Sequence, residues 1–366
     1  MLEINATETV REGSIFGQIT TMDHEQLVIC QDQATGLKAL IGIHNTILGP
    51  ALGGTRMWPY ATEEEAITDV LRLSRGMTFK NSLAGLNLGG GKAVIIGDPK
   101  LKNEAFLRRF GRFVESLGGR YVTAEDVNMK TSDMEYIAME TRHVTGLPQI
   151  KGGAGDPSPV TAFGVYMGMK AAAKKAFGSD SLAGKKIGVQ GVGQVGKYLI
   201  NYLVKEGAEI LITDIFEDKL REIANSTGAT VVDPNVIYDL PMDIYAPCAL
   251  GATINDQTID RLKCAVIAGG ANNQLKDEAK HGKILMEKGI IYAPDFLINA
   301  GGVINVGAEY YGDYHEETVF AQTEKIYNTC LTILDKSEKE NIPAQQAAIE
   351  AAKARIEAIG RVKLPY

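Results

Sequence analysis

Lys92 stands directly behind three glycines and in front of an apolar run, in the stretch LNLGGGKAVIIGD at residues 86–98. A glycine run ahead of a lysine is typical of loops whose backbone N–H groups wrap a phosphate while the lysine reaches its oxygens. Such loops need Ser or Thr after the lysine and a helix beyond, whereas here Ala93 precedes a β-branched run. The stretch therefore predicts a lysine that leads into a strand. A solvated lysine in a plain glycine-rich turn is the alternative.

A second glycine-rich turn is flanked by the elements that a dinucleotide site needs. The apolar run 187–190 predicts a buried strand, residues 198–205 predict a helix with one apolar face, and residues 209–213 predict a second strand. The turn reads GVGQVG over residues 191–196, and Asp214 follows its first glycine by 23 residues (214 − 191). This arrangement is typical of a dinucleotide-binding βαβ unit, and a plain βαβ unit without a ligand is the alternative.

Each position of this turn has a physical reason in a dinucleotide site. Gly191 permits the tight turn, Gly193 lets the backbone approach a pyrophosphate at the helix N-terminus, and Gly196 allows close packing of helix and strand. Asp214 can accept hydrogen bonds from a ribose diol and would repel a 2′-phosphate, which favours NAD over NADP. We expect cofactor contacts from Thr161, Gly191, Val192, Gly193, Gln194, Val195, Gly196, Asp214, Cys248, Ala249 and Asn272.

The composition is that of an ordinary globular protein, with 366 residues, of which 45% are hydrophobic and 23% charged. This length suits two domains of about 100–200 residues each. The formal charge of -7 and the lack of a Lys/Arg run argue against nucleic-acid or membrane binding, so small molecules and other subunits are the expected partners. The cysteines and histidines show no metal-ligand spacing, which predicts no metal site. Neither a signal-type N-terminus nor an apolar run of ~18 residues is present, which predicts a soluble cytoplasmic protein.

We expect an α/β fold with two domains, joined at the Gly/Pro-rich stretch 151–178. Residues 1–147 would form a substrate-binding and oligomerisation domain, and residues 148–331 a Rossmann-type doubly wound dinucleotide-binding domain. Helices over 332–366 would pack back on the first domain. The last of them would start near Pro343 and stop at Gly360. Apolar runs near residues 243, 264 and 291 read as strands, so Asn272 and Asn299 are expected at strand ends that face the cofactor.

Several motifs, in order along the chain, resemble those of the Glu/Leu/Phe/Val dehydrogenase family. They are GPALGGTRMW (49–58), RGMTFKNSLAGLNLGGGKAVIIGDP (75–99), RYVTAEDVN (120–128), the glycine-rich turn, AGGANNQL (268–275) and INAGGVINV (298–306). The resemblance is closest to the leucine dehydrogenase branch of the family. It implies an NAD-dependent amino acid dehydrogenase that catalyses reversible oxidative deamination to a 2-oxo acid and ammonium.

The resemblance also implies roles for three polar residues. In this family the lysine of MTFKN, here Lys80, holds the substrate α-carboxylate, and the lysine of GGGK, here Lys92, is the catalytic base. The aspartate of AEDV, here Asp126, is implied as a proton-transfer partner. Two ammonium groups in one cleft repel and burial disfavours charge, so Lys92 can lose its proton and activate the water that attacks the iminium. The three glycines would let substrate and nicotinamide lie close to that amine.

The substrate pocket implied by the resemblance is apolar. Its expected members are Leu52, Gly53, Gly54, Met77, Lys80, Ala124, Asn272, Val303 and Val306. Glutamate-specific relatives carry a lysine at the position of Leu52, and a charged substrate side chain would be left unpaired in a dry pocket. Branched aliphatic amino acids are therefore expected, with L-leucine preferred and L-isoleucine and L-valine also accepted. One methylene is worth only ~1–3 kcal/mol, so discrimination among the three stays open.

Other interpretations remain open from the sequence. A valine- or phenylalanine-preferring enzyme of the same family is the near alternative, and a non-catalytic dinucleotide or amino-acid sensor is the distant one. The family implies a homo-oligomer, an octamer built through the amino-terminal domain. Lys130, which stands where many relatives differ, would either lower the pKa of Asp126 or point to solvent.

Overall fold

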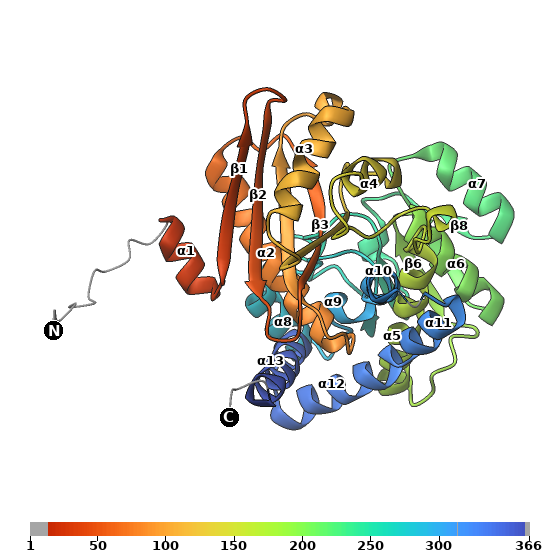
Figure 1. Cartoon of the computed structure of the whole chain (residues 1–366). Coiled ribbons are helices and arrows are strands. Elements are labelled where there is room, and N and C mark those ends of the chain that lie inside the picture. The colour runs from red at the N-terminus through yellow and green to blue at the C-terminus, as the bar shows by residue number, and fades with distance from the viewer. Residues whose placement is uncertain (1–13, 313, 363–366) are drawn as a thin grey trace. The chain divides into compact units, whose positions relative to one another are not determined.

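The computed structural model describes residues 14–312 and 314–362, which form two compact units (Figure 1). The first unit contains the described residues up to Thr78 together with Asn87–Lys151. The second contains Phe79–Leu86 and the described residues from Gly152 onward. In the structure, residues 79–86 and the carboxyl-terminal helices thus belong to the second unit. The functional division into domains at 147/148 stays a prediction.

The first unit is built on a sheet that has five strands in the described residues, in the order β1-β2-β4-β3-β5. The strands are β1 (Gln26–Asp32), β2 (Leu37–Asn45), β3 (Ala51–Trp58), β4 (Gly89–Ile96) and β5 (Tyr121–Glu125). β2 is antiparallel to β1 and β4, whereas β3 is parallel to β4 and β5. Lys92 lies inside β4, so the prediction that it leads into a strand is confirmed, although the strand already begins at Gly89.

Helices cover both faces of this sheet. One face packs on α3 (Glu104–Glu115), which crosses the strands in Figure 1, and on α4 (Thr131–Ala138). α3 begins where Asn103 accepts a hydrogen bond from the N–H of Phe106, and its apolar residues recur every three to four positions on the side facing the sheet. The opposite face packs on α2 (Glu63–Leu83) and α1 (Ile15–Met22).

The second unit has a parallel sheet of six strands, counted over the described residues, in the order β11-β10-β9-β6-β7-β8. They are β6 (Lys186–Gln190), β7 (Glu209–Thr213), β8 (Thr230–Val231), β9 (Ile244–Pro247), β10 (Val266–Ile267) and β11 (Ile291–Tyr292). Read from β8, this is the 3-2-1-4-5-6 order of a doubly wound dinucleotide-binding fold, which confirms the predicted fold class. From β6 the chain adds β7 and β8 on one side, and it then returns to add β9, β10 and β11 on the other side of β6. The strand order therefore changes direction between the neighbours β6 and β9.

The helices of the second unit are α5 (Ser158–Phe177), α6 (Gln194–Glu206), α7 (Glu217–Thr227), α8 (Glu278–Glu287), α9 (Asp295–Ile298), α10 (Gly301–Tyr311), α11 (Glu316–Glu324), α12 (Ile326–Glu340) and α13 (Ala344–Val362). α13 continues through Gly360, so the predicted helix stop there is wrong. The apolar run after residue 291 gives only the short β11, followed by α9 and α10. Among the described helices, none combines the length and apolar character that a membrane crossing requires.

α13 packs beside the last turn of α2. Arg355 donates hydrogen bonds to the carbonyls of Ser82 and Leu86, and the Ser82 hydroxyl donates to the carbonyl of Ala352. These residues fall within 1–147, the predicted first domain, but the structure groups them with the second unit.

Candidate active site

The α2-facing side of the first sheet brings together three charged side chains, of which Lys92 and Asp126 were expected from the sequence. Arg56 of β3 lies opposite Val94 of β4, so Arg56 and Lys92, two positions before Val94, point to the same face. The register of β5 beside β3 brings Asp126, the residue after the end of β5, to this face as well. Period-two alternation in three neighbouring parallel strands therefore assembles two cations and one carboxylate from distant parts of the sequence.

Lys92 and Asp126 form an ion pair. Lys92 is 6% exposed, and its Nζ contacts Oδ2 of Asp126. The Nε of Arg56 lies 3.5 Å from the same oxygen. Burial raises the pKa of Asp126, but the positive charges of Lys92 and Arg56 outweigh burial and bring that pKa down to about 2. Asp126 is therefore an ionised acceptor held in direct contact with the Lys92 amine.

This arrangement changes two expectations from the sequence. The argument for Lys92 as a base used the repulsion of two ammonium groups and the effect of burial, whereas the structure also places the Asp126 carboxylate in contact with the Lys92 amine. Lys130 is exposed, which matches the alternative that it points to solvent, and the cation that joins Lys92 in lowering the pKa of Asp126 is Arg56. Sequence reasoning missed Arg56. The available signal was its position in the motif 49–58, two residues after Gly54.

The three glycines before Lys92 are buried against the protein itself. A Cβ placed on Gly90 would lie 2.0 Å from the Thr78 hydroxyl of α2, and one on Gly91 would lie 2.7 Å from the ring of Tyr121. A Cβ on Gly89 would lie 2.0 Å from a backbone oxygen of β2. These contacts give the glycines a packing role that the sequence did not predict, and room for substrate and nicotinamide stays a prediction. The glycines let α2 and the neighbouring strands pack closely around β4.

The expected pocket residues of the first unit lie on or beside the face that carries Lys92. Leu52 and Ala124 are buried there, and Met77 of α2 is half-buried. Gly53 and Gly54 permit close approach of strands, because a Cβ at Gly53 would lie 1.7 Å from a carbonyl oxygen of β4. A Cβ at Gly54 would lie 3.0 Å from the Cβ of Asp126.

The remaining expected substrate residues belong to the second unit. Lys80 Nζ donates a hydrogen bond of 3.0 Å to Oδ1 of Asn272, which also accepts one of 2.8 Å from Asn299. Asn299 caps the end of α9, so its predicted place at a strand end is wrong. Val303 and Val306 lie on α10, where Val306 is buried. The predicted pocket thus draws on residues of both units, and its assembly stays a prediction.

The glycine-rich turn of the second unit leaves space in front of a helix. Gly193 stands at the N-terminus of α6 without a side-chain cap, and a Cβ there would meet no atom within 4 Å. The space beside Gly193 is therefore open, and the first turn of a helix has N–H groups without a partner inside the helix, a combination that suits a phosphate. Gly191 has φ +103, and a Cβ on Gly196 would lie 2.1 Å from the carbonyl oxygen of Gly191. The predicted reasons for these two glycines, the turn and the close packing, are confirmed.

The other expected cofactor residues surround this turn or lie on α5. Asp214 accepts hydrogen bonds from the N–H of Val192 at 2.8 Å and of Phe216 at 3.1 Å, so it fixes the turn. Gln194 and Val195 form the first turn of α6, and Ala249 packs against Gly191. Thr161 donates to the carbonyl of Pro157 and packs at the start of α10. Burial raises the pKa of Cys248 to about 11, which keeps its thiol protonated.

The open helix terminus, the glycine turn and the acid at the end of β7 fit a dinucleotide. Within the described residues, no group of three or more His, Cys, Asp or Glu side chains is arranged to hold a metal ion.

Comparison with known proteins agrees with this geometry. The Glu/Leu/Phe/Val dehydrogenase dimerisation domain matches residues 24–143, and the glutamate/leucine/phenylalanine/valine dehydrogenase domain matches 152–214 and 211–362. The chain belongs to the Glu/Leu/Phe/Val dehydrogenase family. Members of this family are oxidoreductases that act on amino acids, so the chain is an amino acid dehydrogenase with a nicotinamide cofactor.

Three relatives illustrate the place of the chain in the Glu/Leu/Phe/Val dehydrogenase family. Leucine dehydrogenase of Thermoactinomyces intermedius is 57% identical over 353 residues, which cover 96% of each chain. Valine dehydrogenase of Streptomyces virginiae is 50% identical over 337 residues, or 91% of this chain and 94% of that one. The crystal structure of L-tryptophan dehydrogenase from Nostoc punctiforme matches with a TM-score of 0.83 at 44% identity, covering 94% of this chain and 99% of that chain.

Proposed function

We propose that this dehydrogenase catalyses the NAD-dependent, reversible oxidative deamination of branched-chain L-amino acids, with L-leucine preferred over L-isoleucine and L-valine. The observation that carries the proposal is the ion pair of the buried Lys92 with the half-buried Asp126, on the sheet face that also bears the apolar Leu52 and Ala124. Identity of 57% to a leucine dehydrogenase supports this substrate class. Identity of 50% to a valine dehydrogenase makes L-valine preference the second candidate.

The protein residues would divide the work between binding and proton transfer. The nicotinamide cofactor supplies the acceptor for the hydride of the substrate Cα. Lys80 holds the substrate α-carboxylate, and Lys92 takes a proton from the water that adds to the iminium. Asp126 stabilises the ammonium that forms on Lys92, because its ionised carboxylate is in contact with Nζ. Acid–base catalysis of this kind contributes about 10²–10⁴-fold.

We further propose NAD as the cofactor, bound across the glycine turn with its adenosine ribose at Asp214. The open space before α6 and the carboxylate at the end of β7 support this assignment. We also propose a homo-oligomer, an octamer, supported at the level of a dimer by the match to a dimerisation domain. A cytoplasmic location stays a prediction from the sequence.

The decisive experiment measures NADH formation with a panel of L-amino acids for the wild-type enzyme and for Lys92→Ala. We expect turnover of leucine, isoleucine and valine, and little with glutamate. Lys92→Ala should lose at least about 10²-fold in kcat while NADH binding, followed by fluorescence, survives in the other unit. A matched control is Lys102→Ala, which removes another lysine–aspartate contact of the first unit, to Asp133. Near wild-type turnover in Lys92→Ala would refute the mechanism, and valine as the best substrate would select the second candidate.

A companion experiment compares kcat/KM for NAD and NADP at fixed L-leucine, before and after Asp214→Ala. A carboxylate at the ribose should favour NAD by about ten- to a hundredfold, and its removal should narrow that ratio. Because Asp214 also holds the N–H of Val192, the variant should weaken use of both cofactors. An unchanged ratio would mean that Asp214 does not meet the ribose.

A further inference from the structure

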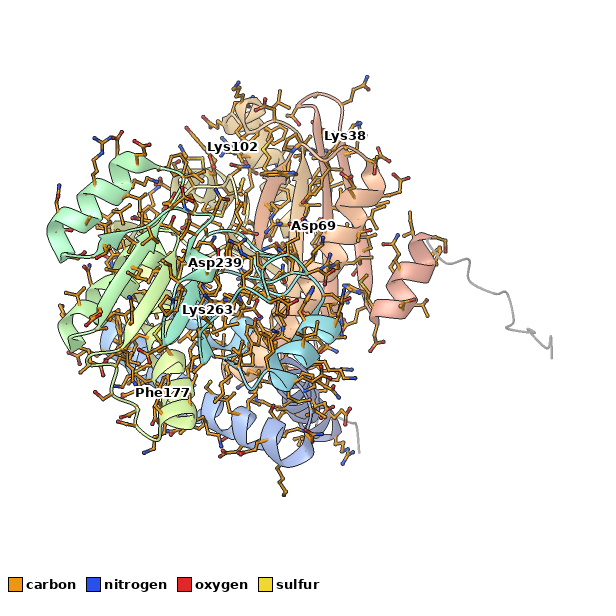
Figure 2. All side chains as sticks on the ribbon, turned by 180° about the vertical axis from the view of Figure 1, so that it is seen from behind. Lys38, Asp69, Lys102, Phe177, Asp239 and Lys263 are labelled. Atoms are coloured by element: carbon orange, nitrogen blue, oxygen red, sulfur yellow. The ribbon has the colours of Figure 1, made fainter. Side chains whose placement is uncertain are left out.

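Arg56 and Asp69 extend the ion pair of Lys92 and Asp126, and the proposed mechanism does not use them. Arg56, with a side chain only 24% exposed, reaches Asp126 through Nε and donates through Nη1 to Oδ2 of Asp69 at 3.1 Å. The hydroxyl of Tyr60 donates to the same Asp69 oxygen at 2.5 Å. Asp69 projects from α2 and is labelled in Figure 2. The Arg56 guanidinium is therefore held from two sides, by the Asp69 carboxylate on α2 and by the Asp126 carboxylate that contacts Lys92.

We propose that Arg56 is a positioning residue for proton transfer, in which its guanidinium, anchored by Asp69 and Tyr60, holds the Asp126 carboxylate against Lys92. This inference rests on the proposed function, because it assigns Arg56 a part in the same reaction. Arg56 itself touches neither water nor substrate in this role. Its effect passes through Asp126.

Charge balance gives the physical reason for such a residue. Among the described residues, Asp126 pairs with Lys92 on β4 and with Arg56 on β3, and Arg56 also pairs with Asp69 on α2, which gives a group of two cations and two anions. When Lys92 gives up its proton, two carboxylates would remain without a cation between them if Arg56 were absent. The Arg56 charge therefore lowers the cost of forming the neutral amine next to Asp126.

Two tyrosines, Tyr60 and Tyr121, are also close enough to feel the charge of Asp126. Burial raises the pKa of Tyr60 and of Tyr121 on β5 well above the usual range, and the negative charge of Asp126 adds to that rise. Both phenols are therefore neutral at working pH. They leave Arg56 as the charged group that balances Asp126 and Asp69 when Lys92 is neutral.

The test compares Arg56→Gln, Arg56→Lys and a control, each with kcat as a function of pH, KM for NAD, and thermal unfolding. Arg56→Gln should lower kcat about ten- to a hundredfold and move the kcat–pH profile about one unit to higher pH, because one cation is lost near the proton-transfer pair. KM for NAD should not change. Arg56→Lys should restore the position of the pH profile and part of kcat, because it returns the charge without the planar fork.

The control is Arg108→Gln, because Arg108 also pairs with two carboxylates of the first unit, Glu104 and Glu140, away from Lys92. It should leave the pH profile in place. If Arg56→Gln does not fold, Tyr60→Phe takes its place and should lower kcat several-fold by loosening Asp69. A loss of kcat that tracks thermal stability, without a pH shift and without rescue by lysine, would overturn the inference. An inactive Lys92→Ala beside normal Arg56 variants would overturn it and leave the proposed function standing.

Discussion

The two glycine-rich stretches of this chain look alike in sequence and differ in what surrounds them. At Gly90 and Gly91, α2 and Tyr121 occupy the space that a side chain would need. At Gly193, by contrast, the space in front of the backbone is open. The glycines at 89–91 thus allow α2 and the neighbouring strands to pack closely around β4, which carries the buried Lys92. The second stretch keeps backbone N–H groups accessible to an anion.

The difference shows that a glycine run does not by itself indicate contact with a ligand. Glycine serves close approach to any partner, whether that partner is a helix of the same chain or a phosphate. In the first unit the chemistry is carried by two side-chain charges, the buried Lys92 and the half-buried Asp126, whose attraction is stronger where water is excluded. In the second unit the chemistry is carried by the backbone N–H groups at the N-terminus of α6, which need open space in front of them.

The largest effect should come from adding a methyl group at Gly90, where protein atoms already occupy the space. Gly90→Ala should cost at least about 3 kcal/mol in the free energy of unfolding, because its Cβ would collide with the backbone and hydroxyl of Thr78, which cannot move without shifting α2. Urea unfolding measures this change. The matched control is Gly76→Ala on the same helix, where a Cβ meets nothing within 4 Å, so that stability should stay level or rise. Equal stability of both variants would mean that β4 is not packed as described.

A smaller effect should appear when the first unit is acidified. His24 is 9% exposed and bonds through Nε2 to Ser74 at 2.8 Å and to the carbonyl of Leu71 at 3.0 Å. Burial lowers its pKa from 6.5 to about 4, so the neutral form belongs to the folded state. Its stabilisation is present above pH ~6.5 and is lost as the pH falls towards 4.

Between pH 7 and pH 5 the free energy of unfolding should therefore fall by about 2 kcal/mol through His24 alone. The buried Asp295 of the second unit has the opposite sign, because burial raises its pKa and its protonated form is favoured on folding. Its contribution grows as the pH falls, so acid should weaken the first unit before the second. His24→Gln should flatten the pH dependence relative to His143→Gln, a partly exposed histidine of the same unit. An unaltered slope in His24→Gln would contradict this prediction.

The smallest effect should come from adding a methyl group at Gly193, where the space beside the backbone is open. Gly193→Ala is expected to leave the thermal midpoint unchanged, since the new Cβ touches no protein atom. It should raise KM for NAD about tenfold, or about 1.4 kcal/mol, because the methyl group occupies the approach of the pyrophosphate to α6. Thermal unfolding and initial rates at saturating L-leucine distinguish the two effects. If Gly193→Ala lost stability without a change in KM for NAD, Gly193 would serve packing, as Gly90 does, and would not keep space for the cofactor.

Local patterns predicted much of the second unit. The strands that flank the glycine turn appear close to the expected limits, because alternation and glycine chemistry act over a few residues. The helix after the turn was also predicted, but it begins at Gln194, four residues before the expected start at 198. Predictions failed where a segment was too short or its partner was distant. The run after Tyr292 turns into α9 and α10, and α13 runs through Gly360.

The sequence by itself determined the chemistry available to this protein: a lysine behind three glycines, an aspartate in a second motif, and a turn with an acid 23 residues after its first glycine (214 − 191). These features are local, so their residue types and spacing can be read directly. The tertiary structure decided that Arg56 and Asp69 join Lys92 and Asp126, and that Thr78 fills the space at Gly90. Such pairings depend on strand register and helix placement, which bring together residues far apart along the chain.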